Sequence, residues 1–502
     1  MSSSSARRSV YKVGGVTILS GLLLCPTLAR AQDAPATPPA DAAPVPAPAP
    51  VAAPAPAAAP ADTAISPEVA RRLDELEARA HADEAQLAAL QAAPTSDAHV
   101  TTGQRGFTIG DNTRDFELKL QGLLQTDGRR IFGSDDPVLR DKTDTFLVRR
   151  ARLYFDATVL GLVDARIMPD FGNNTTALLD AYTDIHPKPW LRLRAGKFKP
   201  PVGLERLQTD AYVTLPERAL DSNLSAQRDV GAELWGDIAN AAIHYELAWL
   251  NGNPDGGLND IDDEHAKTYG GRLFLRPFQL GDLRPFGDLG FGLAVESGNE
   301  KGSNTITSGA AANTWLPSFK SYSQNAIFTY VSSGTDATQT AYASHHHTRV
   351  NPQLYYYVGP VGLLAEWVHE YQELQRGALR GAVNNQAGHV TVSVAIGGDN
   401  SYDGVRPHAP VNWATKDFGA VELVARYGWL DIDDLAFKNK FFADNTKSVS
   451  EAKEWTFGAN WWLNRNAKLY ASWGRTTFVQ GAAGGANRPT ENVGIARIQL
   501  AF

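Results

Sequence analysis

The chain has 502 residues, and its 47 lysine and arginine residues against 55 aspartate and glutamate residues give a net charge of −8. An acidic chain lacks the positive surface of a general nucleic-acid-binding protein, so we expect no nucleic-acid partner. The single cysteine, Cys25, lies in the N-terminal segment described next, which leaves the rest of the chain without disulfides or thiol chemistry.

Residues 1–31 have the organisation of a secretory signal peptide. Arg7, Arg8 and Lys12 form a positive start, residues 13–24 form a short apolar run, and residues 29–31 read Ala-Arg-Ala, an A-x-A cleavage site. The apolar run is too short to serve comfortably as a membrane anchor. No later apolar run has the length of a transmembrane helix, so we expect either a periplasmic protein or a membrane β-barrel.

Two segments precede the main body of the chain. Residues 32–64 are almost entirely alanine and proline, which predicts an extended linker that cannot build a core. Residues 65–93 carry an apolar a/d stripe, which predicts a short helical coiled-coil segment. Asp83 interrupts the stripe, so a single amphipathic helix resting on the body is the alternative, and we favour an oligomerisation helix. The stripe consists of Val69, Leu73, Leu76, Ala80, Leu87 and Leu90.

From residue 105 to residue 502 the dominant period is two, as in β-strands. Apolar and polar residues alternate within residues 116–124, 421–429, 469–473 and 498–502. Strands of about ten residues with apolar side chains outward and polar side chains inward are the pattern of a membrane barrel. A soluble β-sandwich has the same alternation with its apolar face inward, so alternation alone leaves both folds open.

Three further features favour a barrel in outer-membrane lipid. Tryptophans near segment ends suit interfacial girdles, and stretches rich in glycine, asparagine, aspartate and serine, such as 251–263 and 299–313, suit long loops. The final strand ends on Phe502 and resembles the terminal strand that bacterial outer-membrane proteins present to their assembly machinery. The girdle candidates are Trp235, Trp249, Trp367, Trp461, Trp462 and Trp473.

Six segments occur in a fixed order along this region: FLVRRARLYF at 146–155, LRAGKFKPPVGLE at 193–205, RDVGAELWG at 228–236, YELAWLNG at 245–252, GAVELVARY at 419–427 and FGANWWLN at 457–464. Together they resemble the phosphate- and polyphosphate-selective porin (porin O and P) family of bacterial outer-membrane proteins. The resemblance implies an all-β fold, an antiparallel barrel of roughly sixteen strands. It also implies a homotrimer whose third long loop folds into each pore.

The region around the first two segments is basic, although the chain as a whole is acidic. Residues 149–206 contain ten lysine or arginine residues and six aspartate or glutamate residues, which favours a place that holds or passes anions. The family is expected to line its pore with arginines and to bind the anion at the inserted loop. The positions that the resemblance assigns to the pore are Arg150, Arg152, Asp180, Lys199, Arg206 and Thr209.

Three positions depart from the family pattern. Arg206 takes the place of a loop lysine, which keeps the charge but changes the geometry of oxyanion binding. Arg152 stands where an aromatic residue is more common, and Asp210 adds a negative charge where a hydroxyl side chain is expected. These departures favour a preference for anions in general over a preference for phosphate.

Alternation makes further predictions about single side chains. Arg149 and Arg150 have opposite parity, so one of them should point away from the pore. Lys197 and Lys199 share the parity of outward leucines, which requires a bend near Gly196. Arg272, Arg426 and Arg497 are predicted to face the lumen, where they line the pore or pair with carboxylates. The tract His345–His347 reads as a solvated loop, and no motif predicts a metal, a cofactor or an enzyme active site.

We therefore predict a porin with a water-filled channel for the passive uptake of phosphate, polyphosphate or other small anions. A general or organic-solute porin on the same barrel is one alternative. A barrel that chiefly anchors the envelope is another, with residues 32–93 engaging the peptidoglycan layer.

Overall fold

The computed structural model describes residues 67–92, 98–103, 106–113, 115–132, 144–260, 266–281, 285–305, 312–333 and 335–502. The chain divides into two compact units, Met1–Ala89 and Leu90–Phe502. The signal peptide and the alanine/proline linker predicted above lie outside the described residues. Helix α1 (Pro67–Ala92) is the long helix of the described chain, and it lacks the apolar run that a membrane-spanning helix needs. Leu76 of the predicted stripe is exposed on α1.

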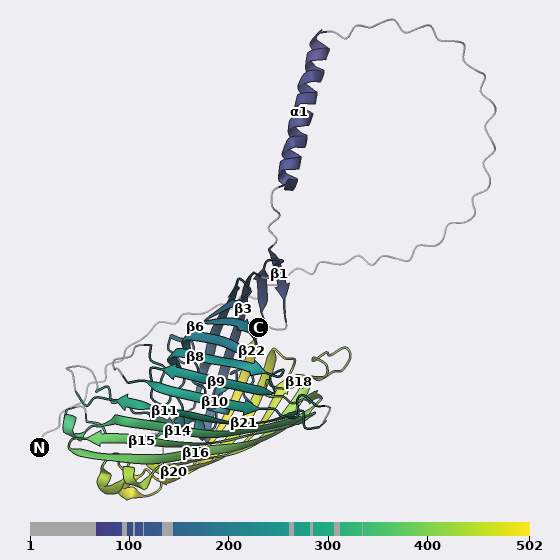
Figure 1. The fold of residues 1–502 in the computed structure, drawn as a ribbon. Coiled ribbons are helices and arrows are strands. Elements are labelled where there is room, and N and C mark those ends of the chain that lie inside the picture. The colour runs from purple at the N-terminus through teal and green to yellow at the C-terminus, as the bar shows by residue number, and fades with distance from the viewer. Residues whose placement is uncertain are drawn as a thin grey trace, which may run out of the picture. The chain divides into compact units, whose positions relative to one another are not determined.

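Sixteen antiparallel strands form one closed barrel, as predicted. Each strand pairs with the next along the chain, and β22 pairs with β3 to close the ring, which Figure 1 shows as yellow strands beside the early blue ones. A hairpin of β1 (His99–Thr102) and β2 (Phe107–Gly110) adds to the start of β3. The barrel strands are β3 Phe116–Phe132, β4 Thr145–Val159, β5 Val163–Asp170, β6 Ala177–Lys188, β7 Leu191–Phe198, β8 Asp229–Ile238, β9 Ile243–Leu250, β10 Thr268–Leu275, β11 Asp288–Lys301, β14 Ala341–Val358, β15 Val361–Arg376, β16 Leu379–Ile396, β19 Ala420–Asp431, β20 Val449–Trp462, β21 Ala467–Gln480 and β22 Glu491–Ala501.

The two faces of the barrel wall have opposite polarity. Leu247 on β9 and Ile498 on β22 are more than half exposed on the outward face, whereas Gln125 and Glu454 on the inward face are fully buried. Apolar outside and polar inside is the reverse of a soluble sandwich, and exposed apolar surface of this extent marks a membrane-facing wall. This inversion decides between the two folds that alternation left open.

The tryptophans divide between the two faces. Trp249, Trp367 and Trp473 are exposed on the outward face, as a girdle requires. Trp235 and Trp462 point inward instead, so their assignment to a girdle is wrong. The Trp235 indole donates to Asp184, and the Trp462 indole donates to Glu422 at 3.0 Å. Trp461 and Trp462 are adjacent in a strand, so only one of them can face outward.

Strand length and loop length both depart from a uniform pattern. Strands β7 and β9 have 8 residues each, whereas β14 and β16 have 18 each, although about ten were expected from the membrane-barrel pattern. At one end of the barrel, the loop end, the connections are long except for residues 377–378. At the other end, the turn end, they are short except for residues 276–287 and the longer turn at residues 397–419. That long turn carries β17 (Gly398–Asp399) and β18 (Arg406–Pro407).

Two loop-end connections fill part of the barrel interior. The inserted loop, residues 199–228, is the third long connection, as predicted, and contains α3 (Leu204–Leu207) and the 3-10 helix η1 (Leu220–Leu224). Residues 312–333, between β11 and β14, form a second insertion, which also turns inward and contains the small sheet of β12 (Ser318–Lys320) and β13 (Ala326–Thr329). The sequence predicts only an outer loop at the start of this segment.

Apolar packing fixes both insertions against one side of the wall. Leu220 and Leu224 of η1 join Phe319 and Phe328 of the second insertion in one buried cluster with β15, β16, β19 and β20. Residues 432–448 add the short helices η3 (Asp434–Ala436) and η4 (Lys438–Lys440), and Phe442 joins the same cluster. The other short helices are η2 (Ala337–Gln339) and η5 (Ala483–Gly485). Open space in the described barrel therefore lies nearer the arginine-rich strands.

Candidate functional site: the lumen constriction

A β-bulge in β4 turns two consecutive arginines into the lumen. The pairing of β3 with β4 passes from Gln125–Arg150 directly to Thr126–Val148, so Arg149 has no partner in the ladder. Arg149 binds Glu217 of the inserted loop at 2.7 Å, and Arg150 donates to Gln125 at 2.7 Å. The prediction that one of the pair points away from the pore is wrong, because the extra residue resets the alternation.

The inserted loop begins at a bend built on glycine. Gly196 has a φ of 129°, and a Cβ there would lie 2.3 Å from the carbonyl oxygen of Ala181, so the bend predicted at this residue is present. Beyond the bend, Lys197 is buried and binds Asp260 at 2.5 Å, away from the pore. Lys199 starts the loop itself and faces the lumen.

Asp210 of the inserted loop is bound by three guanidinium groups. Arg150 lies 3.2 Å from its carboxylate, Arg218 lies 2.5 Å away, and Arg152 makes a further ion pair with it. Burial alone raises the pKa of the Asp210 carboxyl, but these cations hold it well below the usual range. The carboxylate therefore stays ionised and occupies the position where the sequence implied a bound anion.

Glu217 binds a second group of wall arginines. It pairs with Arg129 of β3, with Arg149 at 2.7 Å and with Arg497 of β22 at 3.1 Å. Burial raises the pKa of the Glu217 carboxyl. The guanidinium groups of Arg149 and Arg129 lower this pKa by more than burial raises it, so that it lies well below its usual value. The two loop carboxylates together neutralise much of the arginine ladder on β3, β4 and β22.

Lys199 and Arg206 have neutral partners instead. Lys199 Nζ donates to the carbonyl oxygens of Leu207 at 3.1 Å and Gln208 at 2.9 Å. Arg206 donates to the carbonyl oxygen of Ser222 and to Ser225 Oγ. Neither forms an ion pair with a carboxylate among the residues that the structure describes. Burial and the nearby Arg218 lower the pKa of Arg206 to about 10, which leaves its guanidinium charged at neutral pH.

The lumen forms two chambers that share a ring of side chains. The loop-side chamber, of about 480 Å³, is lined by Arg149, Arg206 and Lys320. The turn-side chamber, of about 330 Å³, is lined by Arg166, Arg194 and Arg272 together with tyrosines. The residues that line both chambers are Arg152, Lys199, Asp210 and Arg228. We call these four residues the constriction ring, because they line both chambers.

All six residues predicted for the pore line one or both chambers. Arg150 and Arg206 line the loop-side chamber, Thr209 and Asp180 line the turn-side chamber, and the remaining two belong to the constriction ring. Asp180 is paired with Arg228, and exposed Thr209 borders open space. Their roles in anion passage remain predictions.

Three arginines predicted to face the lumen all do so, and all are paired. Arg272 binds Glu246 at 3.0 Å, Arg426 binds Glu454 at 2.8 Å, and Arg497 binds Asp127 at 2.6 Å. The interpretation that they pair with carboxylates therefore holds for each of them. Buried pairs of this kind are costly to break, because removal of one partner leaves an uncompensated charge.

The contributors to the site that sequence reasoning missed include Arg228 and Arg218. Arg228, which lines both chambers, lies in a segment used only for its family resemblance, and Arg218 lies in no matched segment. The prediction of a solvated loop at His345–His347 is wrong, because the tract lies within β14 at a bulge and His347 is buried against Glu300 and Glu370. His345, with a φ of 67°, takes up the irregular backbone that makes this possible.

The sequence matches one family model, and the chain is similar to several known outer-membrane proteins. Residues 119–502 match the model of the family described as phosphate-selective porin O and P. Porin O of Pseudomonas aeruginosa is 23% identical over 401 residues, which cover 73% of this chain and 84% of that protein. Among solved structures, the outer membrane channel DcaP of Acinetobacter baumannii covers 79% of this chain and 100% of its own, at 11% identity and a TM-score of 0.49. The trimer form of in-vitro folded OmpT of Vibrio cholerae covers 77% of this chain and 99% of its own, at 12% identity and a TM-score of 0.45.

The family match extends over the whole barrel, from β3 to the C-terminal residue. Porin architecture also accounts for the apolar outward face, the polar lumen and the loop that narrows it. The chain belongs to the phosphate-selective porin O and P family, and it is a channel-forming porin of the bacterial outer membrane.

Proposed function

We propose that the channel is anion-selective and carries phosphate and other small anions passively across the outer membrane. The observation that supports this most directly is the pair Lys199 and Arg206. Both line the loop-side chamber, and neither has a carboxylate partner among the described residues. Their charge is therefore available to a passing anion, whereas the charges on the wall arginines are largely balanced by loop carboxylates.

The arrangement suits passage better than tight binding. An anion that enters the constriction loses part of its hydration, and ammonium and guanidinium groups replace it. Release must stay easy, so several moderate contacts serve better than one deep site. Asp210 weakens anion binding at this site, because its carboxylate is already paired with Arg150, Arg152 and Arg218. We infer that a phosphate ion meets a weaker site here than it would with a hydroxyl residue at position 210.

Planar-bilayer recording tests the proposal. In a gradient of potassium chloride the reversal potential should show anion preference, and added phosphate should reduce the chloride current. Arg206→Ala should lower the anion-to-cation permeability ratio about threefold, the effect of one partly screened charge. Arg206→Lys is the matched control and should keep the ratio within error.

Three outcomes would contradict the proposal. They are a cation preference in the wild-type channel, an unchanged ratio in Arg206→Ala, and a chloride current that phosphate leaves intact. The last two would favour the general porin over the phosphate channel.

A second candidate solute is an organic anion with a planar body. The turn-side chamber is lined by Tyr154, Tyr182, Phe198 and Tyr402, and the Arg194 guanidinium lies 4.6 Å from the centroid of the Tyr182 ring. Aromatic faces beside arginines accept planar carboxylates. Benzoate should then block chloride current at lower concentration than acetate does. Equal potencies would count against this candidate.

For assembly, we propose a homotrimer in which α1 supports association and residues 32–93 reach the peptidoglycan layer. Deletion of residues 33–95 should leave single-channel conductance unchanged and weaken trimers in crosslinking and native mass measurements. Co-sedimentation with purified peptidoglycan should be lost. A fall in conductance, or trimers and sedimentation that persist, would contradict these roles. Contact of the C-terminal Phe502 with the outer-membrane assembly machinery is a further proposal, tested by the yield of folded Phe502→Ala barrel in membranes.

A further inference from the structure

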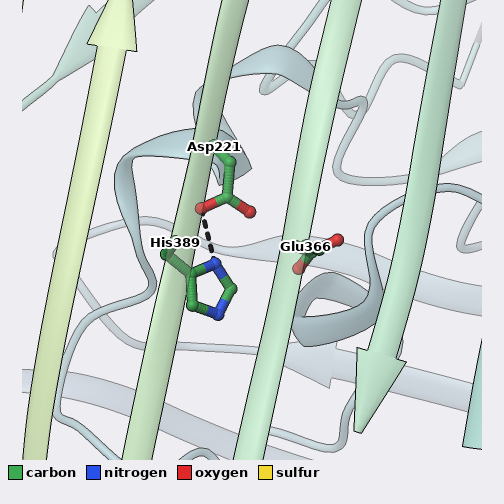
Figure 2. Close-up of side chains that lie close together, drawn as sticks. All are labelled: Asp221, Glu366 and His389. Carbon is green, nitrogen blue, oxygen red and sulfur yellow. Dashed lines mark hydrogen bonds and ion pairs between the residues drawn. The ribbon is translucent and has the colours of Figure 1, made fainter.

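A buried group of three side chains joins the inserted loop to the barrel wall. Asp221 lies on η1 of the loop, while Glu366 on β15 and His389 on β16 are direct partners in the sheet. Figure 2 shows the three side chains close together, with a hydrogen bond from the His389 ring to Asp221 and the Glu366 carboxylate to one side. One ligand atom from each residue lies within 4.8 Å of the other two, and the exposed fractions are 2%, 5% and 0% in the order given.

The hydrogen bonds within this group are incomplete. His389 Nδ1 shares a 2.8 Å bond with Asp221 Oδ1, which leaves Nε2 buried and without a hydrogen-bond partner among the described residues. A buried polar atom without a partner costs stability and calls for an explanation such as an ion. The two carboxylates also bring two negative charges into a buried place, and one histidine can offset at most one of them.

We propose that Asp221, Glu366 and His389 bind one divalent transition-metal ion, for which Zn²⁺ is the best fit. Two carboxylate oxygens and an imidazole nitrogen are ligands that Zn²⁺ accepts, and neutral histidine with two carboxylates balances the charge of a divalent ion. Ligands about 2.0–2.2 Å from one Zn²⁺ lie within about 3.6 Å of one another, so the group needs only a small contraction to close on the ion.

The surroundings hold one ligand in place. Glu366 Oε2 accepts hydrogen bonds from the backbone N–H of Leu204 at 2.6 Å and from Asn351 at 3.1 Å. Oriented ligands of this kind are typical of metal sites, where the outer partners fix the carboxylate. The ion would clamp the inserted loop to β15 and β16 on the side opposite the arginine ladder. None of the three residues lines either chamber, so the ion should enter during folding and exchange slowly afterwards.

The sequence gives no hint of this site. The three residues are far apart in the chain, so no short spacing motif contains them. Only the pairing of β15 with β16 and the path of the inserted loop bring them together. The inference is independent of the ion selectivity proposed above.

The test measures the zinc content of the full-length barrel, folded in detergent with Zn²⁺ or with a chelator and then passed through a desalting column. Wild-type protein folded with Zn²⁺ should retain one ion per chain. His389→Gln and Glu366→Gln, which approximately keep side-chain size, should retain none or bind at least about tenfold more weakly. The control variant His345→Ala/His346→Ala removes exposed histidines on β14 and should retain the ion.

A second measurement does not depend on the folding of the variants. Wild-type protein folded with Co²⁺ should show the visible absorption of cobalt bound to nitrogen and oxygen ligands, and added Zn²⁺ should abolish it. The proposal is overturned if wild-type protein retains no ion and shows no such absorption. It is equally overturned if the folded His389→Gln and Glu366→Gln variants retain as much zinc as wild type, or if only the His345/His346 control loses it.

Discussion

The inserted loop is fastened to opposite sides of the barrel by contacts of opposite polarity. Toward β3, β4 and β22, the loop supplies the carboxylates of Asp210 and Glu217, and the wall supplies arginines. Toward β15 and β16, the wall supplies the Glu366 carboxylate, which accepts two backbone N–H groups of the loop at 2.6 and 2.8 Å. On that side Asp221 is the loop carboxylate, and its wall partner is a histidine.

The difference shows where the selectivity of the channel must originate. On the arginine side, the loop cancels charge that the wall would otherwise present to the lumen, so a count of wall arginines overstates the attraction for anions. On the glutamate side, the contacts are buried away from both chambers and serve to hold the loop. The charges that remain for a solute include Lys199 and Arg206, which lie on the loop itself, and Lys320 of the second insertion. The loop therefore neutralises the wall arginines and supplies positive charge to the lumen in their place.

The largest expected effect comes from Asp210→Asn. The change removes the shared counter-charge of Arg150, Arg152 and Arg218 at the constriction ring, so these guanidinium groups become available to anions. We expect the anion-to-cation permeability ratio to rise about fivefold, equivalent to about 1 kcal/mol for one partly screened charge near the path. Block of chloride current by phosphate should strengthen in the same variant. Reversal potentials and phosphate titrations in planar bilayers measure both effects.

The matched control for this change is Glu454→Gln. Glu454 is also a buried carboxylate paired with an arginine, Arg426, but it lines neither chamber. Its neutralisation should leave the permeability ratio near the wild-type value. If the two variants shifted the permeability ratio equally, the net charge of the barrel, and not the position of Asp210, would set selectivity. The different contacts on the two sides of the loop would then not explain which ions pass.

The sequence predicts the barrel well because its signals are repeated along the chain. Alternation in many strands, family segments in a fixed order and an aromatic end all point to the same closed sheet, and single errors do not change that result. Trp462 illustrates the limit, since tryptophan suits an interface girdle but also fills a lumen when its indole N–H finds Glu422. Residue type alone does not give the face.

The site is harder to predict because one irregular residue can reverse a local assignment. The bulge at Arg149 brings two consecutive arginines to the same face, and no residue of β4 signals it. The pairing of Asp210 with three arginines depends on the path of a 30-residue connection across the lumen, which spacing does not encode. Resemblance assigned these cations to the pore, but it could not say which of them the loop would neutralise.

The second prediction concerns pH and Lys199. Burial, Arg228 and Arg218 together hold the pKa of Lys199 well below that of an ordinary lysine. Its charge is therefore complete at low pH and is lost as pH rises through a range below the usual lysine titration. Anion preference should fall about twofold over that range, the effect of one screened charge. Reversal potentials in chloride salts report this without the titration of phosphate itself.

Lys199→Arg sharpens the assignment, because a guanidinium at this position stays protonated across the same range. The variant should show a flat pH profile while it keeps the anion preference of wild type at low pH. A pH dependence of equal size in Lys199→Arg would move the titrating group elsewhere. The proposal that the loop, and not the wall, supplies the free positive charge would then not hold for Lys199.

The smallest effect is expected from the loss of a hydrogen bond between two uncharged groups that holds the inserted loop. Tyr402, in the long turn at residues 397–419, donates its hydroxyl to the carbonyl oxygen of Leu204 at 2.6 Å, and Tyr402→Phe removes only that bond. The free energy of unfolding should fall by about 1 kcal/mol, measured by denaturant titration of the folded barrel, because the Leu204 carbonyl loses its shorter hydrogen bond and keeps only the one from the Gln208 N–H at 3.3 Å. The permeability ratio should not change, since no charge moves. Tyr427→Phe, on the outward side of β19, is the control and should alter neither quantity. A shift in selectivity in Tyr402→Phe alone would mean that the position of the loop, and not only its charge, sets which ions pass.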